Sequence, residues 1–550
     1  MRRPAASATL FSLDANWRLA AFEVVWIFLI FFLVAGSQPP DVGESHYLVK
    51  AKHYWQPAWC AGDLFCESHD AHGVFYWTLG WVTRIASLTA TAWIGRAVTW
   101  GLLAWSWRRL SWALVPQPLV SLLSAGLMLL LLRNFHLAGE WIVGGVEAKG
   151  FAYVLVFLAL EAIVRGSWRA ALLLAGAAGA FHVLVGGWTV VAIGAAWLLA
   201  GKERPAAKSL LPAAIGGLVL SLPGLLPALL LNRGTDGVVS VEAARIYVFE
   251  RLPHHLVYHR FTAAHIWRFA ALVAAWLALA IALRGDEKLR RLNLVVAGAA
   301  LLGLIGVALD QSLALWAKTS AQTAEAYEQA AAPLLRYYWF RLSDSFVPIG
   351  AALAIVAGLQ QLQAARPAWA SWLSAAAILL AGANVADVYY WRHRQPLPGA
   401  ILQSRPTADA AARWWHSPRA KAPPGEISAR AWFRDWQAVC TWIDEHTPKT
   451  AKFVTPREQQ TFKWYAGRAE VANWKDVPQD ARGILEWKAA MQALRTRTDL
   501  AQLARDFGAQ YVLIDTTRTG RPQGLRRIYP LAREENSTFE VYRLPEPLAP

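Results

Sequence analysis

The chain has 550 residues, of which 56% are hydrophobic and only 17% are charged, and its formal net charge is +16. Repeated apolar runs of membrane-spanning length exclude a soluble two-domain enzyme and predict a polytopic protein that lies in a lipid bilayer. Much of the Lys and Arg excess sits in short connections between these runs, which positive-inside topology explains better than nucleic-acid binding. We therefore expect no nucleic acid as a partner.

Hydropathy predicts eleven spans. The first covers about 19–36, and because no small-residue cleavage site follows it, we expect it to be uncleaved with the N-terminus in the cytoplasm. The other ten are predicted at 88–106, 118–133, 150–165, 169–184, 187–200, 209–231, 268–284, 292–309, 346–362 and 370–390.

The connections between spans predict the orientation of the chain. The short even-numbered connections are basic, which assigns them to the cytoplasm. The odd-numbered connections then lie outside, and three of them are long, at 37–87, 232–267 and 310–345. An odd number of spans also leaves the C-terminal part outside, and we expect a bacterial inner membrane.

The end of the chain has a different composition. We predict a transmembrane domain over 1–394, a linker rich in Pro, Ala and charge over 395–427, and an extracytoplasmic α/β domain over 428–550. Residues 451–456 and 510–515 are typical of buried strands, and 484–507 has helical spacing, which favours a partly parallel sheet. The predicted fold class is a mostly α transmembrane bundle with a C-terminal α/β domain.

The first outer loop carries the first candidate site. Asp41 and Glu44 stand at the mouth of the first span, where ionisable groups are costly unless they have a function. A carboxylate at an apolar boundary has its pKa raised toward the working range of a general base. The alternative is a capping box at the start of a helix, with Asp41 as N-cap and Glu44 three residues on. Further candidates in this loop are His46, Lys50 and His53.

The second outer loop is dense in cationic and imidazole groups. These groups suit a phosphate or pyrophosphate, Arg through its forked guanidinium and His as a donor. The set consists of Arg245, Arg251, His254, His255, His259 and Arg260. A metal at His254, His255 and His259 stays open, as does an interfacial belt of basic and aromatic groups.

Two further places carry candidates. Arg336 and Arg341, in an aromatic run before the span at 346–362, are placed to neutralise a lipid phosphate at the membrane surface, although an aromatic belt with anchoring Arg is the commoner explanation. Gly144 and Gly145 in another outer loop are flanked by His136, Glu140, Glu147 and Lys149. His182 lies within an apolar run, where lipid raises the chance of a function.

The layout resembles the membrane glycosyltransferases of the GT-C fold. The likeness rests on one cytoplasmic-start span, a long outer loop opening with Asp41 and Glu44 and continuing through Tyr47 and Lys50 to His53, many spans and an outer α/β domain. Residues 43–47, 145–151 and 249–255 are also similar to a bacterial membrane-protein family of this type with no assigned activity.

The resemblance implies a reaction. A sugar on a polyprenyl phosphate would be transferred with inversion to a glycan, lipid or protein acceptor. Asp41 or Glu44 would be the base, and Arg and His groups of later loops would hold the phosphate. No cofactor is obligatory for this chemistry, although a divalent metal stays open. The alternative is a non-enzymatic transporter or binding protein for a lipid-linked or anionic solute, which predicts broken spans and a midplane site.

Overall fold

All eleven predicted spans fall on helices in the computed structural model, which describes residues 16–394, 397–404, 429–531 and 536–545. These helices are α1 (Trp17–Ala35), α5 (Leu88–Leu114), α6 (Val120–Asn134), α7 (Ala148–Val164), α8 (Trp168–Phe181), α9 (Val183–Leu199), α10 (Ala207–Leu230), α13 (Ala263–Ala282), α14 (Glu287–Thr319), α16 (Arg341–Ala365) and α17 (Pro367–Arg394). Within the described residues, six of them are long and apolar enough to cross a membrane: α1, α10, α13, α14, α16 and α17. The protein is a multi-pass membrane protein.

The bundle has a buried centre and a lipid-facing rim. In α16, 83% of the apolar window is buried, whereas in α10 only 17% is. Leu229 on α10 and Leu379 on α17 expose 70% and 71% of their surface. Because a surface of this kind would be unfavourable in water, we read it as the face that contacts lipid tails.

Buried ion pairs join three helices of the bundle. Glu23 on α1 lies 2.9 Å from Arg108, and Glu161 on α7 lies 2.8 Å from Arg109. The sequence predicts a cytoplasmic connection at Arg108 and Arg109, but α5 continues to Leu114. The carboxylates of the neighbouring helices explain this, because they satisfy both guanidinium groups within the packed bundle.

The long outer connections fold into short helices. The first contains α2 (Glu44–Trp55), α3 (Leu64–Glu67), α4 (Gly73–Thr78) and η1 (Gly80–Arg84). The second contains α11 (Gly237–Arg245), the π-helix η3 (Ile246–Arg251), α12 (Pro253–Leu256) and η4 (Tyr258–Arg260). The third contains α15 (Ala324–Leu335). The preceding helix α14 is about 50 Å long and therefore extends beyond the membrane core, which is about 30 Å thick. The connecting helices η2 (Gly201–Glu203) and α18 (Gly399–Ser404) complete this part of the chain.

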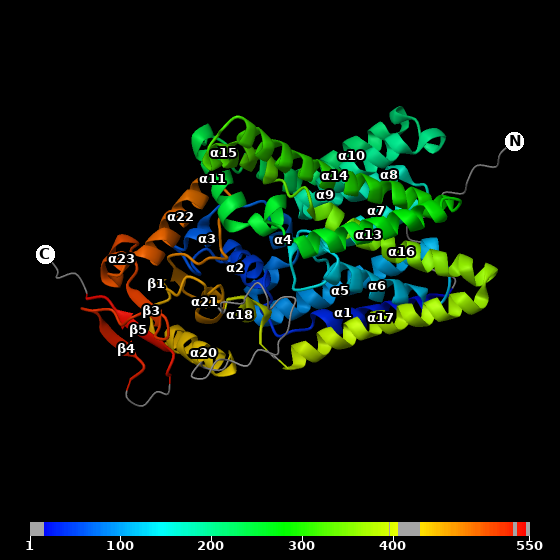
Figure 1. The fold of residues 1–550 in the computed structure, drawn as a ribbon. Coiled ribbons are helices and arrows are strands. Elements are labelled where there is room, and N and C mark those ends of the chain that lie inside the picture. The colour runs from blue at the N-terminus through cyan, green and yellow to red at the C-terminus, as the bar shows by residue number, and fades with distance from the viewer. Residues whose placement is uncertain (1–15, 395–396, 405–428, 532–535, 546–550) are drawn as a thin grey trace.

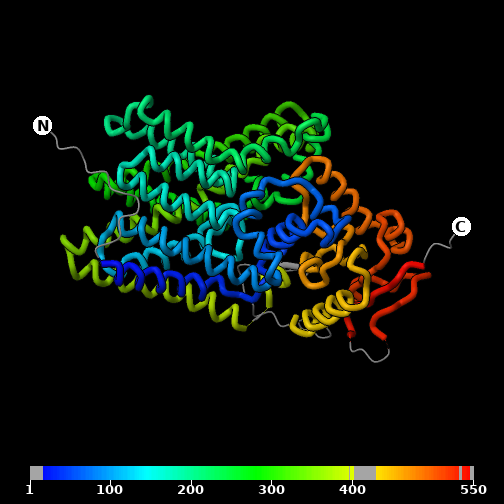
Figure 2. Tube along the Cα trace, turned by 180° about the vertical axis from the view of Figure 1, so that it is seen from behind, coloured from blue at the N-terminus to red at the C-terminus, as the bar shows by residue number. Residues whose placement is uncertain are grey.

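The C-terminal part is an α/β unit beyond one end of the bundle (Figures 1 and 2). Its elements are α20 (Ala429–His446), β1 (Lys452–Val454), α21 (Phe462–Ala466), β2 (Ala469–Glu470), α22 (Ala481–Thr496), α23 (Leu500–Asp506), β3 (Tyr511–Asp515), β4 (Arg526–Tyr529) and β5 (Phe539–Arg543). The strand order is β2-β1-β3-β5-β4, with β1 parallel to β2 and β3, and β5 antiparallel to β3 and β4. The predicted strands, the helical stretch between them and the partly parallel sheet are confirmed.

The α/β unit packs directly on the outer loops. Ala243 and Ile246 of the second loop share an apolar cluster with Trp487 of α22. Most of the predicted linker 395–427 lies outside the described residues, and the boundaries at 394 and 428 stay predictions. This packing brings loops far apart in sequence to one end of the bundle.

Candidate functional site

Asp41 and Glu44 lie in the turn that leads into α2. The Asp41 amide donates to Oε2 of Glu44 at 2.7 Å, which is one half of the capping-box alternative. The other half is not formed, because the Asp41 carboxylate accepts instead from the amides of Val42 (2.9 Å) and Gly145 (3.1 Å). The two acids are therefore bound quite differently.

Glu44 is occupied by an ion pair. Its two oxygens accept from Nε and Nη2 of Arg96, each at 2.6 Å, and Oε1 also accepts from the Val146 amide at 2.8 Å. Both side chains are 0% exposed. A bidentate pair of this kind is a strong and geometrically specific interaction, so Glu44 is bound on all sides.

Asp41 keeps a freer carboxylate. It forms no ion pair with any described residue, and it is only half-buried. Two glycines allow the backbone to approach it: a Cβ on Gly145 would lie 2.7 Å from the Asp41 Cβ, and one on Gly399 would lie 2.1 Å from its Oδ1. A larger residue at either position would displace the acid.

Glu147 lies beside this acid. Its carboxylate covers Gly43, where an added Cβ would be 1.5 Å from Oε1. Burial raises the pKa of Glu147 above its usual value. Lys149 and Lys475 oppose the rise, while Glu140 and Asp41 add to it. Two carboxylates from different outer loops, Asp41 and Glu147, thus share one site.

A chain of paired charges continues from Glu147. The Lys149 ammonium lies 3.8 Å from Glu147 and 3.1 Å from Glu140, and it sits 3.6 Å above the Trp141 ring. The other oxygen of Glu140 lies 2.9 Å from Nε of Arg341, whose Nη1 lies 3.0 Å from Nε2 of His182. Four of the predicted candidates, Glu147, Lys149, His182 and Arg341, therefore lie in one network.

Two cations next to this network, the buried Arg251 and the partly exposed Lys475, form no ion pair with any described residue. Arg251 is 8% exposed, its Nε has no hydrogen-bond partner, and its guanidinium lies 5.4 Å from the Trp474 ring centre. The Lys475 ammonium forms no hydrogen bond or ion pair with any described residue. Burial, and after it the Arg251 cation, lower the pKa of Lys475 to about 8, although Glu147 and Asp476 act in the opposite direction. Unpaired buried charge is costly, so this pair is suited to bind an anion.

His254 and His255 lie beside these cations. His254 interacts electrostatically with Arg251 and Lys475, and the ring centroids of the two histidines are 4.1 Å apart. Nδ1 of His255 is hydrogen-bonded to the carbonyl of Ala138, and burial lowers the pKa of His255 well below its usual value. His255 is therefore neutral and serves to position this loop.

The other predicted phosphate ligands lie apart from this cluster. Arg245 is held by Glu242 (2.7 Å), Glu250 (3.2 Å) and Glu328 (3.2 Å). Nδ1 of His259 lies 3.1 Å from Asp310. Arg260 is exposed, and the Arg336 side chain forms no hydrogen bond or ion pair with any described residue. The structure thus brings together one half of the predicted set.

Three candidates of the first outer loop are held by hydrogen bonds within the loop or to the α/β unit. Nδ1 of His46 lies 3.1 Å from Asp476, Nζ of Lys50 donates to the Phe65 carbonyl at 2.9 Å, and Nδ1 of His53 lies 2.8 Å from the Trp59 carbonyl. These contacts hold the loop together and tie it to the α/β unit.

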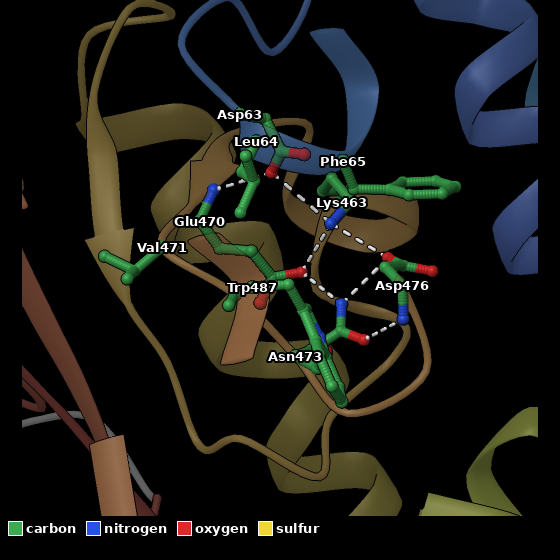
Figure 3. A pocket seen from close by; sticks show the side chains of 10 residues that line it. Asp63, Leu64, Phe65, Lys463, Glu470, Val471, Asn473, Asp476 and Trp487 are labelled. Carbon is green, nitrogen blue, oxygen red and sulfur yellow. Dashed lines mark hydrogen bonds and ion pairs between the residues drawn. The ribbon is translucent and has the colours of Figure 1, made fainter. Parts of the chain in front are cut away.

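A buried charge cluster fixes this loop to the C-terminal unit (Figure 3). Nζ of Lys463 lies 3.3 Å from Asp63, 2.7 Å from Glu470 and 2.9 Å from Asp476. Burial by itself raises the pKa of Asp476, but Lys463 and the hydrogen bond to His46 outweigh it and hold that pKa well below its usual range. Since Lys475 directly precedes Asp476, the cluster also positions the unpaired ammonium.

Sequence reasoning left out Arg96 and did not connect two residues of the C-terminal unit with the outer loops. Arg96 lies within an apolar span, and an arginine there was a usable signal, because it requires a carboxylate partner. The sequence offered Lys475 and Trp474 of the C-terminal unit as side chains that could contact sugars, but nothing in it placed them beside Arg251. Among the described residues, no three His, Cys, Asp or Glu side chains gather as metal ligands.

Comparisons with known proteins give the following. Residues 434–494 match a family model described as a domain of unknown function (DUF6798). A search of the curated proteins gave no match. The chain is similar to a structure of the oligosaccharyltransferase AglB from Archaeoglobus fulgidus in complex with an inhibitory peptide and a dolichol-phosphate, with 11% identity, a TM-score of 0.44, and 91% of this chain and 70% of that chain covered.

Two further structures of the Archaeoglobus fulgidus oligosaccharyltransferase are similar. One is a complex with Zn and sulfate, at 13% identity and a TM-score of 0.40, covering 90% of this chain and 68% of that chain. The other is tethered to an acceptor peptide, at 12% identity and a TM-score of 0.40, covering 92% of this chain and 69% of that chain. At these identities and TM-scores, no residue role is transferred from these proteins.

Proposed function

We propose that this protein is a membrane glycosyltransferase that transfers a sugar from a polyprenyl-phosphate donor to an acceptor hydroxyl at the outer face of a bacterial inner membrane. The observation that carries the proposal is a pair of cations, the buried Arg251 and the partly exposed Lys475, that form no ion pair with any described residue and lie next to Glu147, which lies against the Asp41 turn. A donor phosphate supplies the missing negative charge, and a nearby carboxylate supplies the base.

The reaction is a single displacement. Asp41 takes the proton of the acceptor hydroxyl, and the acceptor oxygen forms a bond to the anomeric carbon while the bond from that carbon to the phosphate oxygen breaks. The configuration at this carbon inverts. The polyprenyl phosphate leaves with one more negative charge, which Arg251 and Lys475 stabilise as it develops.

Asp41 is preferred to two neighbouring carboxylates. Glu44 has both oxygens bound by Arg96, so proton transfer to it would break a buried ion pair. Glu147 is 8% exposed and lies 3.8 Å from the Lys149 ammonium. Asp41 is held by backbone amides alone, leaving it the most accessible of the three.

The test is transfer from a radiolabelled polyprenyl-phosphate sugar by the purified protein, with donor binding measured in parallel. Asp41→Asn should lower turnover by roughly a hundredfold or more while donor binding persists. Arg251→Gln and Lys475→Gln should each weaken donor binding about tenfold. Arg260→Gln, in the same loop but apart from the cluster, is the control and should change neither.

Three results would refute parts of the proposal. Full turnover by Asp41→Asn would show that Asp41 is not the base. Weakened donor binding in Arg260→Gln alone would show that the donor phosphate binds near Arg260 and not at Arg251 and Lys475. Donor binding by the wild-type protein without transfer to any acceptor would favour the non-enzymatic alternative, a transporter or binding protein for a lipid-linked or anionic solute.

A further inference from the structure

A cavity of about 400 Å³ lies between the C-terminal parts of α6 and α17. Its lining includes Leu130, Arg133, Asn134, Leu380, Asn384 and Asp387. Both helices run toward the end of the bundle that carries the α/β unit (Figure 1). Leu379 and Leu380 of α17 are 71% and 60% exposed, so the cavity borders the lipid-facing surface. We call it the α6–α17 groove.

An unpartnered donor lies in this groove. Asn384 is 6% exposed, and its Oδ1 accepts from Nη1 of Arg133 at 3.1 Å and from Nδ2 of Asn134 at 3.5 Å. Its own Nδ2 is buried and has no hydrogen-bond partner among the described residues. A buried donor of this kind is normally satisfied, which indicates a ligand that offers an acceptor oxygen.

The groove has no net charge of its own, but an unpaired cation lies beyond its outer end. Arg133 is compensated by Asp387, with 2.8 Å between Nη2 and Oδ2. Arg392 lies two turns beyond Asn384 on α17, about 12 Å along the helix axis. It forms no ion pair with any described residue, and its Nη1 is buried without a partner. A ligand that satisfies both groups is therefore anionic.

Arg392 also links the groove to the proposed base. Its guanidinium interacts electrostatically with Asp41, Arg96 and Arg133. The groove thus lies on the bilayer side of Asp41. Arg251 belongs to the second outer loop and Lys475 to the α/β unit.

We propose that the α6–α17 groove binds the headgroup of an anionic glycerophospholipid, and that a membrane lipid of this class presents the acceptor hydroxyl to Asp41. The assignment of an acceptor rests on the proposed transferase function, while the binding of the lipid does not. The headgroup phosphate faces Arg392 and an oxygen accepts from Nδ2 of Asn384.

The test is native mass spectrometry of the full-length protein titrated with phosphatidylglycerol, phosphatidylcholine, polyprenyl phosphate and inorganic phosphate. Asn384→Asp keeps the oxygen that Arg133 and Asn134 bind and replaces the free donor by a charged acceptor. This variant and Arg392→Gln should each weaken phosphatidylglycerol binding about tenfold and leave polyprenyl phosphate binding unchanged. Arg394→Gln, exposed at the end of the same helix, is the matched control and should bind like the wild type.

Several outcomes overturn the proposal. Equal phosphatidylglycerol binding by all variants removes the groove as a lipid site, and loss of polyprenyl phosphate binding instead assigns it to the donor. Variant-sensitive binding of inorganic phosphate alone shows a free-anion site. If the two variants lose phosphatidylglycerol while Asp41→Asn keeps full turnover, the lipid site stands and the proposed base fails.

Discussion

The carboxylate of Glu44 and the guanidinium of Arg96 form two hydrogen bonds of 2.6 Å each, although 52 residues separate them in the chain. Both side chains are completely buried. This pair joins the first outer loop to α5 and leaves Asp41, three residues before Glu44, as the acid free for chemistry.

Glu44→Gln should destabilise the protein strongly. The change leaves the Arg96 charge buried and uncompensated, which costs about 3–5 kcal/mol. Asp41→Asn removes no ion pair and should alter stability by less than about 1 kcal/mol. Thermal unfolding in detergent measures both changes.

A double variant separates the ion pair from other effects. Glu44→Gln combined with Arg96→Met removes both charges and should recover part of the lost stability, because no unpaired charge remains. A double variant less stable than Glu44→Gln alone would show that Arg96 is stabilised mainly by its other contacts.

Anion binding should depend on the protonation of Lys475, whose pKa burial lowers to about 8. A bound phosphate favours the charged ammonium, so affinity is full below about pH 8 and falls as the pH rises through that value. Lys475→Arg keeps its charge over this range and should abolish the decline. Titration calorimetry with polyprenyl phosphate measures both proteins, and an identical decline in the two would contradict the assignment.

Lys463→Met should destabilise the protein in a pH-dependent way. It removes the cation that lies within 3.3 Å of three buried carboxylates and should cost about 3–5 kcal/mol near neutral pH. In the wild type the depressed pKa of Asp476 contributes stability above the ordinary carboxyl pKa of about 4, and that contribution is lost as the pH falls.

In the Lys463→Met variant the buried carboxylates change stability with pH in the opposite direction. Unpaired buried carboxylates have raised pKa values, so the penalty is present above these values and is relieved as the acids become protonated. The stability difference between wild type and variant should therefore narrow from about pH 7 to about pH 4. A constant difference in chemical denaturation over this range would mean that Lys463 acts through packing.

The orientation of the chain can be tested with reporter fusions. Basic even-numbered connections and an odd number of spans predict the C-terminal unit outside the cytoplasm. Alkaline phosphatase fused after residue 550 should be active, and the same enzyme inserted in the connection at 201–206 should be inactive. The reverse pattern would place Asp41 on the cytoplasmic side.

The sequence predicted much of the fold because membrane spans and buried strands depend on local composition. All eleven spans fall on helices, and 451–456 and 510–515 contain strands β1 and β3. The extension of α5 to Leu114 was missed, since it depends on the ion pairs of Arg108 and Arg109 with other helices.

The candidate site was only partly predictable. Asp41, Glu147 and Arg251 were recognisable because ionisable groups near a membrane boundary stand out. Their partners were not, since Lys475 comes from the α/β unit and the α6–α17 groove depends on how two helices pack. For the same reason Arg245 looked like a phosphate ligand, although three glutamates compensate it.

The most direct test is the position of the donor phosphate in a cryo-electron microscopy map of Asp41→Asn with a bound polyprenyl-phosphate sugar. We predict the phosphate within hydrogen-bond distance of Arg251 and Lys475, with the anomeric carbon turned toward residue 41. A phosphate bound at Arg245 or His259, or one held by Arg392 next to the α6–α17 groove, would contradict the proposed arrangement of base and donor.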